Sequence, residues 1–416
     1  MNPFLKLNTP TKLTSILLIT VLLFTACGSE EINKNFSDYD NWEQVLADGE
    51  GQEVTILMWG GNEIINQYMD TFVADHLKSL YDITLKRVPM NAPDYLAKLL
   101  NEKKNEVADG TADLLWINGE NFRTAKEGGL IDGPFTDLLP NLTTYYDPSS
   151  ADLSYDSGIP IKGYEGIWGR AQLVLTYDEA IVPNPPKNYA ELKEWIIANP
   201  GQFTYPKVPD DFVGTAFVRT AFYELSDDSV DYQVELTKEA FTALGEPVMD
   251  YFKEISPYLW REGTTYPATQ SQLDDLFKNG EVAMTMGFEV GKTSGLVASG
   301  VYPVTVKSYV FETGTIGNSH YLAVPYNAPQ KAAALLVIDF LESPIAQIEK
   351  MKPQVWGDMP AVDINTLSEE YMAIIVTLDG GKGGIPLAEL TDKRLPEMQA
   401  KYIDWIKELW VNELGQ

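Results

Sequence analysis

The sequence predicts an α/β protein with a parallel, doubly wound sheet, divided into two domains or lobes. Its 416 residues are more than one small hydrophobic core needs. From residue 52 onward, strand-like and helix-like segments alternate, which is typical of parallel sheets with crossover helices. A stretch punctuated by glycine and proline, residues 163–186, then separates this alternation from a second set of helices.

Three strand–helix pairs are expected in the first part of the chain. The first strand, residues 54–59, is apolar almost throughout, as in strands that are buried on both faces. Apolar residues at helical spacing follow it as far as Leu80, with Asn62 as the expected N-cap. We expect the remaining strands at residues 83–88 and 113–117, and the remaining helices at 94–104 and 120–127.

A second group of elements follows the glycine-rich stretch. The pattern predicts extended chain at 171–177 and 309–324, a buried strand at 282–286, and helices at 189–198, 237–258, 330–341 and 395–414, with Pro344 opening a further helix. The last helix is amphipathic and carries Trp405 and Trp410. We interpret its apolar stripe as core and not as a partner site.

The first residues have the pattern of a signal peptide. Two lysines precede the apolar run 13–24, which is too short to span a bilayer, since a span needs about 20 residues. Small residues then lead to Cys27, the only cysteine in the chain. This resembles a bacterial lipobox, which implies removal of residues 1–26 and a diacylglycerol on the Cys27 thiol. The alternative is a secretory peptide cut after Ala26, which leaves a free thiol.

The charge of the chain argues against some partners. The formal net charge is −29, and removal of residues 1–26 takes away two lysines and no acids. Nucleic acid is not expected as a partner, because phosphate contacts need a basic surface. A bound cation is compatible with the charge, although a solvated acidic surface explains it without any ligand. Residues 27–51 are polar and acidic, and we interpret them as a tether with a short helix near residues 42–46.

No catalytic residue, metal site or cofactor is predicted. The two histidines, His76 and His320, lie far apart in the sequence and away from any nucleophile motif. Patterns such as HExxH, CxxC, GxGxxG and GxxxxGK[ST] do not occur in the sequence. A carboxylate pair could serve a glycosidase in principle, yet the sequence singles out none of its 60 acidic residues. We therefore do not expect an enzyme.

Two strand-to-helix joints are the main candidates for a ligand site, because ligands of open α/β sheets bind at the carboxyl ends of strands. Both joints combine tryptophan, glycine and asparagine. Glycine lets a ligand approach the backbone, and the first N–H groups of a helix can hold an anion or a carbonyl. The alternative is a pair of plain turns. The predicted binding residues are Trp59, Gly60, Gly61 and Asn62 at the first joint, and Trp116, Asn118, Gly119, Glu120 and Asn121 at the second.

Other stretches combine aromatic residues with acids and glycines, and we add residues from them to the predicted site. Aromatic faces with nearby carboxylates can hold an organic cation. Loop packing is the alternative for each stretch. The added residues are Trp168 and Gln172 in the glycine-rich stretch, Tyr205 in the loop after the helix 189–198, and Phe288 and Glu289 after the strand 282–286.

These residues, with several more, resemble the extracellular solute-binding proteins of ABC importers, family 1, and in particular their YnjB-type branch. The resemblance runs in order across almost the whole mature chain. Its motifs are Trp59-Gly60-Gly61, DLLWINGENF (113–122), Trp168-Gly169 with Gln172, FTYP (203–206), GTIGNSH (314–320), FLESPIAQ (340–347) and Trp356-Gly357-Asp358. Lys207 and Val208 depart from the proline-rich stretch of the thiamine-binding relatives.

The resemblance implies a two-lobed type II periplasmic-binding-protein fold, in which each lobe has a mostly parallel sheet flanked by helices and a hinge joins the lobes. Residues 52–174 and 316–360 would form lobe 1, residues 175–315 lobe 2, and residues 361–416 helices packed on lobe 2. The resemblance also adds Trp356 to the ligand site. The implied function is capture of one small solute between the lobes and delivery to an ABC permease. The protein would be a monomer, held outside the cytoplasm by a lipid on Cys27.

The solute is predicted to be a small organic cation of a thiamine-like or polyamine-like kind. Trp59, Trp116 and Trp168 would supply the aromatic faces. Glu120 or Glu289 would supply the carboxylate. Two alternatives stay open. An extracellular hydrolase built on the same lobes would turn over a substrate through a histidine or a carboxylate pair. A surface adhesin would lack an enclosed pocket between the lobes.

Overall fold

The computed structural model describes residues 34–226, 230–378 and 380–415. The predicted signal peptide, the predicted lipidation site Cys27 and the first part of the predicted tether lie outside the described residues. Within these residues, no helix combines the length and the apolar character that a membrane span requires.

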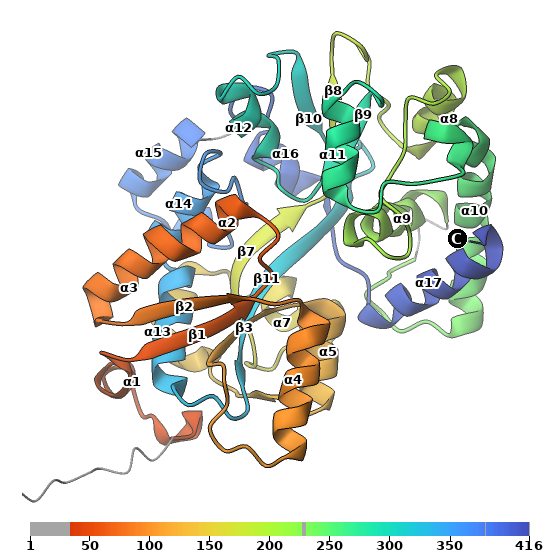
Figure 1. The fold of residues 1–416 in the computed structure, drawn as a ribbon. Helices are drawn as coiled ribbons and strands as arrows, with labels where there is room; N and C mark the ends of the chain where they lie inside the picture. Colours follow the sequence, from red (N-terminus) through yellow and green to blue (C-terminus); the bar gives the residue numbers. More distant parts are fainter. Residues whose placement is uncertain (1–33, 227–229, 379, 416) are drawn as a thin grey trace, which may run out of the picture. The chain divides into compact units, whose positions relative to one another are not determined.

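A seven-stranded sheet, here called the first sheet, contains the early strands (Figure 1). Its strands are β1 (Glu53–Met58), β2 (Thr84–Pro89), β3 (Leu114–Ile117), β4 (Ile131–Asp132), β7 (Gly166–Gln172), β11 (Thr315–Pro325) and β12 (Arg394–Leu395). The order β12-β11-β3-β1-β2 has β4 and β7 paired to β11 as well. β1 pairs in parallel with both β2 and β3, which confirms the predicted parallel order of the first three strands. β11 joins β3 in the antiparallel sense.

Helices cover both faces of the first sheet, which explains why β1 is an apolar run. Val54 and Ile56 face one core, called the α13-face core, and Leu57 faces the other, called the α4-face core. The α13-face core includes residues of α1 (Trp42–Gly49), α2 (Glu63–Tyr68), α3 (Ala74–Tyr81), α13 (Lys331–Glu342) and α14 (Pro344–Met351), and a π-helical turn, Met69–Val73, joins α2 to α3. The α4-face core includes residues of α4 (Ala92–Lys104) and α5 (Gly119–Glu127). The chain then continues through α6 (Pro140–Tyr145), α7 (Ala151–Ser154) and the hairpin of β5 (Tyr155–Asp156) and β6 (Ile159–Pro160).

The second sheet has three strands and differs from the expected mostly parallel arrangement. β8 (Val174–Asp178) lies between β9 (Met284–Gly287) and β10 (Val306–Tyr309) and is antiparallel to both. β9 and β10 therefore run in the same direction, and α12 (Lys292–Ala298) connects them. The reason for the difference is that β8 continues directly from β7 through Leu173. β8 therefore runs away from the first sheet, whereas β9 and β10, which are antiparallel to it, run towards the first sheet.

A large aromatic and aliphatic core, called the second-sheet core, packs against this sheet. Its helices are α8 (Tyr189–Ala198), α9 (Phe212–Leu225), α10 (Lys238–Ile255), α11 (Gln270–Lys278), α12 and α17 (Ala400–Leu414). The other C-terminal helices are α15 (Glu369–Leu378), which packs on α14, and α16 (Leu387–Asp392). Short 3-10 turns lie at Phe36–Asp38, Thr136–Leu138, Ser256–Tyr258, Trp260–Gly263 and Ile364–Thr366.

β7 and β11 are strands of the first sheet that run side by side towards the second sheet (Figure 1). They are antiparallel, with Gly317 opposite Gln172 and Leu322 opposite Gly166. β11 begins in the second-sheet core, which contains Ile316, and ends in the α13-face core, which contains Leu322. A third segment lies beside them, because β12 pairs in parallel with the start of β11. These segments connect the two sheets.

Two stretches differ from the expectations at the ends of the chain. Within the predicted tether, the side chains of Phe36, Tyr39 and Val45 are buried in the α13-face core, together with apolar residues of α13. The last helix begins at Ala400 instead of residue 395. Its first expected residue, Leu395, belongs to β12, and Pro396 disfavours helical backbone in the residue before it.

Candidate functional site

The two predicted joints meet at one edge of the first sheet. β1 and β3 are parallel neighbours, with Ile56 opposite Leu114 and Leu57 opposite Leu115. Their carboxyl ends therefore point the same way, and the joints at residues 59–62 and 118–121 follow these ends directly. This is the edge at which open α/β sheets bind ligands.

The first joint is shaped by tight packing around its two glycines. A Cβ on Gly60 would come within 2.5 Å of the Pro89 Cβ at the end of β2. A Cβ on Gly61 would collide with the Trp59 indole, which lies over this glycine while 44% of the residue's surface stays exposed. The Asn62 side chain accepts hydrogen bonds from two backbone N–H groups and so caps α2, as predicted. Gly60 is therefore required by the close approach of β2, whereas Gly61 lies under the exposed Trp59 indole.

The second joint is held by polar side chains from other parts of the fold. Gly119 has a φ of +56°, a conformation that favours glycine, and its N–H donates to the Asp156 carboxylate. The Asn118 side chain donates to Asn318 Oδ1 at 2.8 Å. Burial raises the pKa of the Asp156 carboxyl to about 7. The backbone of this joint is therefore fixed by a carboxyl group that is protonated more easily than an ordinary aspartate.

Glu120 and Asn121 lie in the first turn of α5, next to α17. The Glu120 carboxylate lies 3.9 Å from the Lys407 ammonium group, and 38% of the Glu120 side chain is exposed. One turn further on, Arg123 lies 3.4 Å from Asp404. α17 therefore packs beside the joint, and Glu120 remains within reach of solvent.

The structure brings three of the predicted tryptophans together. The Trp116 ring is edge-on to Trp168 at 5.2 Å between centroids, and Trp168 is edge-on to Trp356 at 5.3 Å. His320 closes the cluster, at 5.1 Å from Trp116 and stacked on Trp356 at 5.5 Å. Trp168 and Trp356 are buried, whereas Trp116 is partly exposed. We call Trp116, Trp168, His320 and Trp356 together the tryptophan cluster. Its members come from β3, β7, β11 and the segment after α14.

A buried ion pair supports the tryptophan cluster. Lys350 Nζ lies 2.6 Å from Asp358 Oδ2, and His320 Nε2 lies 3.3 Å from Asp358 Oδ1. The ammonium group is 5.5 Å from the Trp356 centroid and 6.0 Å from the Trp168 centroid. Burial opposes ionisation of Asp358, but the charges of Lys350 and His320 outweigh it and hold the pKa of Asp358 below its ordinary value. A protein cation therefore already occupies the faces of two tryptophans.

Gln172 is the last residue of β7 and lies opposite Gly317 of β11. It has no exposed surface, and its Nε2 donates to Thr315 Oγ1 at 3.1 Å and to the Lys393 carbonyl at 3.0 Å. The side chain thus contacts the start of β11 and the segment before β12.

The predicted residues of the second half fall in three different places. Tyr205 is fully buried in the second-sheet core, where its ring packs on Phe217 and Phe252. Phe288 is partly exposed and packs on Phe212, the first residue of α9, at 5.2 Å between centroids. These residues are not joined to the tryptophan cluster by any ring contact of the described part of the chain.

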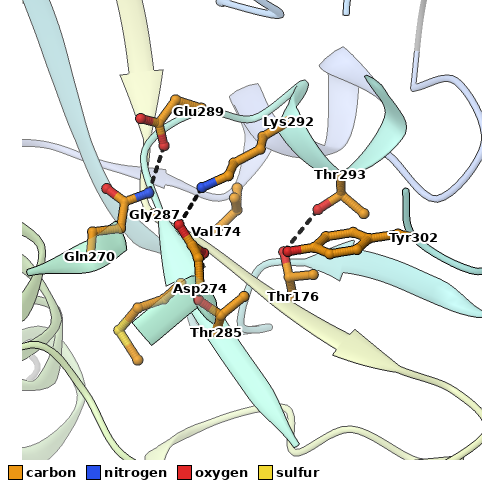
Figure 2. A pocket seen from close by; sticks show the side chains of 11 residues that line it. Val174, Thr176, Gln270, Asp274, Thr285, Gly287, Glu289, Lys292, Thr293 and Tyr302 are labelled. Carbon is orange, nitrogen blue, oxygen red and sulfur yellow. Dashed lines mark hydrogen bonds and ion pairs between the residues drawn. The ribbon is translucent and has the colours of Figure 1, made fainter. Parts of the chain in front are cut away.

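Glu289 lines a small polar pocket between the second sheet, α11 and α12 (Figure 2). Figure 2 shows its carboxylate facing the amide of Gln270 and the Lys292 ammonium group facing Asp274. Gln270 Nε2 donates to Glu289 Oε2 at 2.8 Å, and the Lys292 ammonium group donates to Asp274. The space between them is about 10 Å³, which is about what one water molecule requires. The pocket is therefore too small for an organic solute as it stands. Among the described residues, no three His, Cys, Asp or Glu side chains gather in a way that could hold a metal ion.

Sequence reasoning did not assign Lys350, Asp358 and His320 to the site. One available signal was Lys350, which lies among buried residues of α14, because a buried ammonium group needs a partner. The Trp356-Gly357-Asp358 motif was the other, since it places a carboxylate beside a predicted site residue. The contact of both with β7 depends on tertiary packing alone.

Solved structures share the fold of this chain. An ABC transporter protein from Clostridium perfringens aligns with a TM-score of 0.61 and 17% identity, over 87% of this chain and 98% of that one. A periplasmic thiamin binding protein aligns with a TM-score of 0.56 and 14% identity, over 87% of this chain and 94% of that one. At these identities the likeness concerns the fold. It is the two-lobed α/β fold of type II periplasmic binding proteins.

The sequence matches the family of bacterial extracellular solute-binding proteins over residues 67–372. The chain is also 36% identical to protein YnjB of Escherichia coli (strain K12) over 331 residues, which are 79% of this chain and 84% of YnjB. The chain therefore belongs to the bacterial extracellular solute-binding proteins, of the ABC-transporter type. Proteins of this family act outside the cytoplasm, where they bind small solutes for an ABC permease.

Proposed function

We propose that this protein is the lipid-anchored solute receptor of an ABC importer, which captures one small solute between its two lobes without covalent chemistry. Residues 52–174 and 316–360 would form lobe 1, residues 175–315 lobe 2, and residues 361–416 would pack mainly on lobe 2. The observation that carries the proposal is the pair of crossing strands, β7 and β11, next to two strand-to-helix joints at one sheet edge. Crossing strands allow the lobes to turn, and the joints offer a surface on which they can close.

We place the solute against the first-sheet edge, with Trp59 and Trp116 as the aromatic faces. Trp59 supports this because almost half of its surface is exposed beside backbone that carries no side chains at residues 60 and 61. Trp116 supports it as the partly exposed member of the tryptophan cluster. Trp168 and Trp356 would support Trp116 from the interior, because they are buried and already face Lys350. Phe288 would approach from the second lobe.

We propose a small organic cation as the solute. The supporting features are the exposed indole of Trp59, the half-exposed carboxylate of Glu120 and the strongly acidic chain. A cation would sit over an aromatic face and near a carboxylate, where it loses little electrostatic stabilisation on leaving water. The thiamin binder among the similar structures is one protein of this fold whose solute is such a cation.

Two measurements test the solute. Native mass spectrometry of the freshly purified protein identifies a retained solute. Thermal-shift screening then compares thiamine, polyamines, neutral sugars and anions. We expect a rise in melting temperature with one of the cations, and its loss in Trp59→Ala with the fold retained. Trp260→Ala is the control, because Trp260 stacks on Arg261 in a 3-10 turn of the second half. Stabilisation by a sugar or an anion alone would overturn the cation, but not the receptor function.

A further inference from the structure

The Gln172 side chain joins three chain segments at the place where strands pass between the two sheets. Gln172 is the last residue of β7, Thr315 is the first residue of β11, and Lys393 directly precedes β12. One amide nitrogen donates to the Thr315 hydroxyl at 3.1 Å and to the Lys393 carbonyl at 3.0 Å. A single buried group therefore contacts all of these segments.

Each of the three segments leads from the first sheet to the second-sheet core. The first passes through Leu173, the one residue between β7 and β8, and Leu173 is buried in that core. The second begins with Thr315 and Ile316, of which Ile316 is buried in the same core. The third continues from β12 to Met398, which is also buried there. Any rotation of the sheets must change backbone angles in these segments, next to Gln172.

The chemistry of the contact requires an amide. Both acceptors, a hydroxyl oxygen and a carbonyl oxygen, face the same Nε2 atom, and Gln172 has no exposed surface. A carboxylate or a methyl group of the same size could donate to neither. The Lys393 carbonyl also accepts a hydrogen bond from the Thr315 backbone N–H at 3.0 Å. The second and third segments thus stay joined without Gln172. The first segment is joined to the second by the β7–β11 pairing, with Gly317 opposite Gln172 and the Leu173 N–H donating to the Ile316 carbonyl at 2.9 Å. The amide adds a contact between the first segment and the third.

Arg394 reinforces the same meeting point from the third segment. Its Nη2 donates to the Asn318 carbonyl and to Ser319 Oγ, both at 3.1 Å. A Cβ on Gly317 would collide with its guanidinium group, so the arginine lies flat on β11. β11 and β12 are therefore fixed to each other, and Gln172 joins β7 to the segment before β12.

We propose that Gln172 is a positioning residue of the hinge: it ties the three segments at one point and so sets how far and about which axis the two lobes turn. This role rests on the proposed closing of the lobes around a solute, and it places Gln172 outside the solute contacts. Without the amide, the first segment stays paired with the second but turns more freely against the third. The lobes then sample a wider range of separations, while both cores stay intact.

The test measures the separation of the lobes without any solute. Spin labels on Gln67→Cys in α2 and Lys278→Cys in α11, both exposed positions, are introduced in a Cys27→Ser background of the full chain. Double electron–electron resonance then gives the distance distribution between the lobes. For Gln172→Met, we expect a broader distribution that extends to longer distances. Amide hydrogen exchange at residues 315–316 and 393–395 should become about tenfold faster, as expected when one or two buried hydrogen bonds are lost.

Gln347→Met is the matched control. Gln347 is equally buried, and its Nε2 donates to the Trp168 carbonyl at 2.6 Å and the Leu341 carbonyl at 2.7 Å, both on the side of the first sheet. This variant should lower the melting temperature and leave the distance distribution unchanged. An unchanged distribution in Gln172→Met, or equal broadening in Gln347→Met, overturns the proposal.

Thr315→Val provides a second route if Gln172→Met does not fold. It removes the hydroxyl acceptor at nearly constant volume and should broaden the distribution to a smaller extent. A distribution identical to that of the unsubstituted chain would count against the proposal in the same way. None of these outcomes depends on the solute, so failure here is distinguishable from failure of the solute-receptor function.

Discussion

Lys350 and Asp358 form an ion pair with 2.6 Å between Nζ and Oδ2, at a place where neither side chain reaches solvent. The pair lies against β7: a Cβ on Gly169 would come within 2.5 Å of both Lys350 Nζ and Asp358 Oδ2. The ammonium group also faces Trp168 and Trp356. The position of the tryptophan cluster therefore depends on charges that the protein keeps out of water.

Removal of one partner of this pair should destabilise the protein strongly. Lys350→Met leaves the Asp358 carboxylate buried beside His320 without its main partner, and such losses cost about 3–5 kcal/mol of unfolding free energy. Urea unfolding, followed by circular dichroism, measures the change. Lys193→Met is the control, because its pair with Glu254 is exposed and should be worth about 1 kcal/mol or less. A small effect at Lys350 would contradict the structure.

Asp156 should make stability depend on pH near neutrality. Burial raises its pKa from 3.8 to about 7, so the folded chain holds a proton that the unfolded chain has released. The stability from this group is present at low pH and is lost as the pH rises towards about 7, by about 1.4 kcal/mol for each unit of pKa difference. Asp156→Asn should flatten this slope and stabilise the protein above neutrality.

Urea midpoints between about pH 4 and pH 8 measure the slope. Asn can still accept the hydrogen bond from the Gly119 N–H, so the second joint should keep its conformation. Asp137→Asn, at an exposed position, is the control and should leave the slope unchanged. A steeper fall in stability with rising pH in Asp156→Asn would contradict the protonation of the Asp156 carboxyl in the folded chain.

The two glycines of the first joint should respond differently to alanine. Gly60→Ala meets Pro89, whose backbone is held by the pairing of β1 with β2, and should cost about 1–3 kcal/mol of unfolding free energy. Gly61→Ala meets the free end of the Trp59 side chain, which can rotate away. Its stability should change by less than about 1 kcal/mol, while acrylamide quenching of Trp59 fluorescence increases. Equal destabilisation by both changes would mean that the indole is fixed more rigidly than its exposure indicates.

The lipid anchor stays a prediction from residues outside the described part of the chain. Cys27→Ser should abolish labelling by radioactive palmitate and move the protein from the membrane fraction to the medium, or leave it uncleaved. Ser29→Ala, two residues further on, should keep both the label and the membrane location. Labelling that persists in Cys27→Ser would refute lipidation at this residue.

Much of the first sheet was predictable, because its strands are local apolar runs and its helices show local periodicity. The predicted helix 189–198 coincides with α8, and the predicted strands 54–59 and 83–88 are each within one residue of β1 and β2. The second sheet was less predictable. The sequence of β8 gives no sign that it runs against β9 and β10, since strand direction follows from where the chain enters the sheet.

The candidate site shows the same division. The local sequence identifies the glycines at residues 60 and 61. Their neighbours, Pro89 of β2 at Gly60 and the Trp59 indole at Gly61, depend on how the chain packs. Tyr205 carries the same aromatic signal as Trp116, but the fold buries it in the second-sheet core. His320 ends the GTIGNSH motif, but no catalytic pattern accompanies it, and only the approach of residues 350–358 gives it a carboxylate partner.

The sequence by itself determined the alternation of strands and helices, the two joints at strand ends and, through its ordered motifs, the family. These features depend on residues that are close along the chain, where periodicity and burial leave a direct pattern. Only the tertiary structure decided the Lys350–Asp358 pair beneath the tryptophans and the meeting of Gln172 with a carbonyl group 221 residues away. Such contacts depend on how segments far apart in the chain pack, and no local pattern of side chains encodes that arrangement.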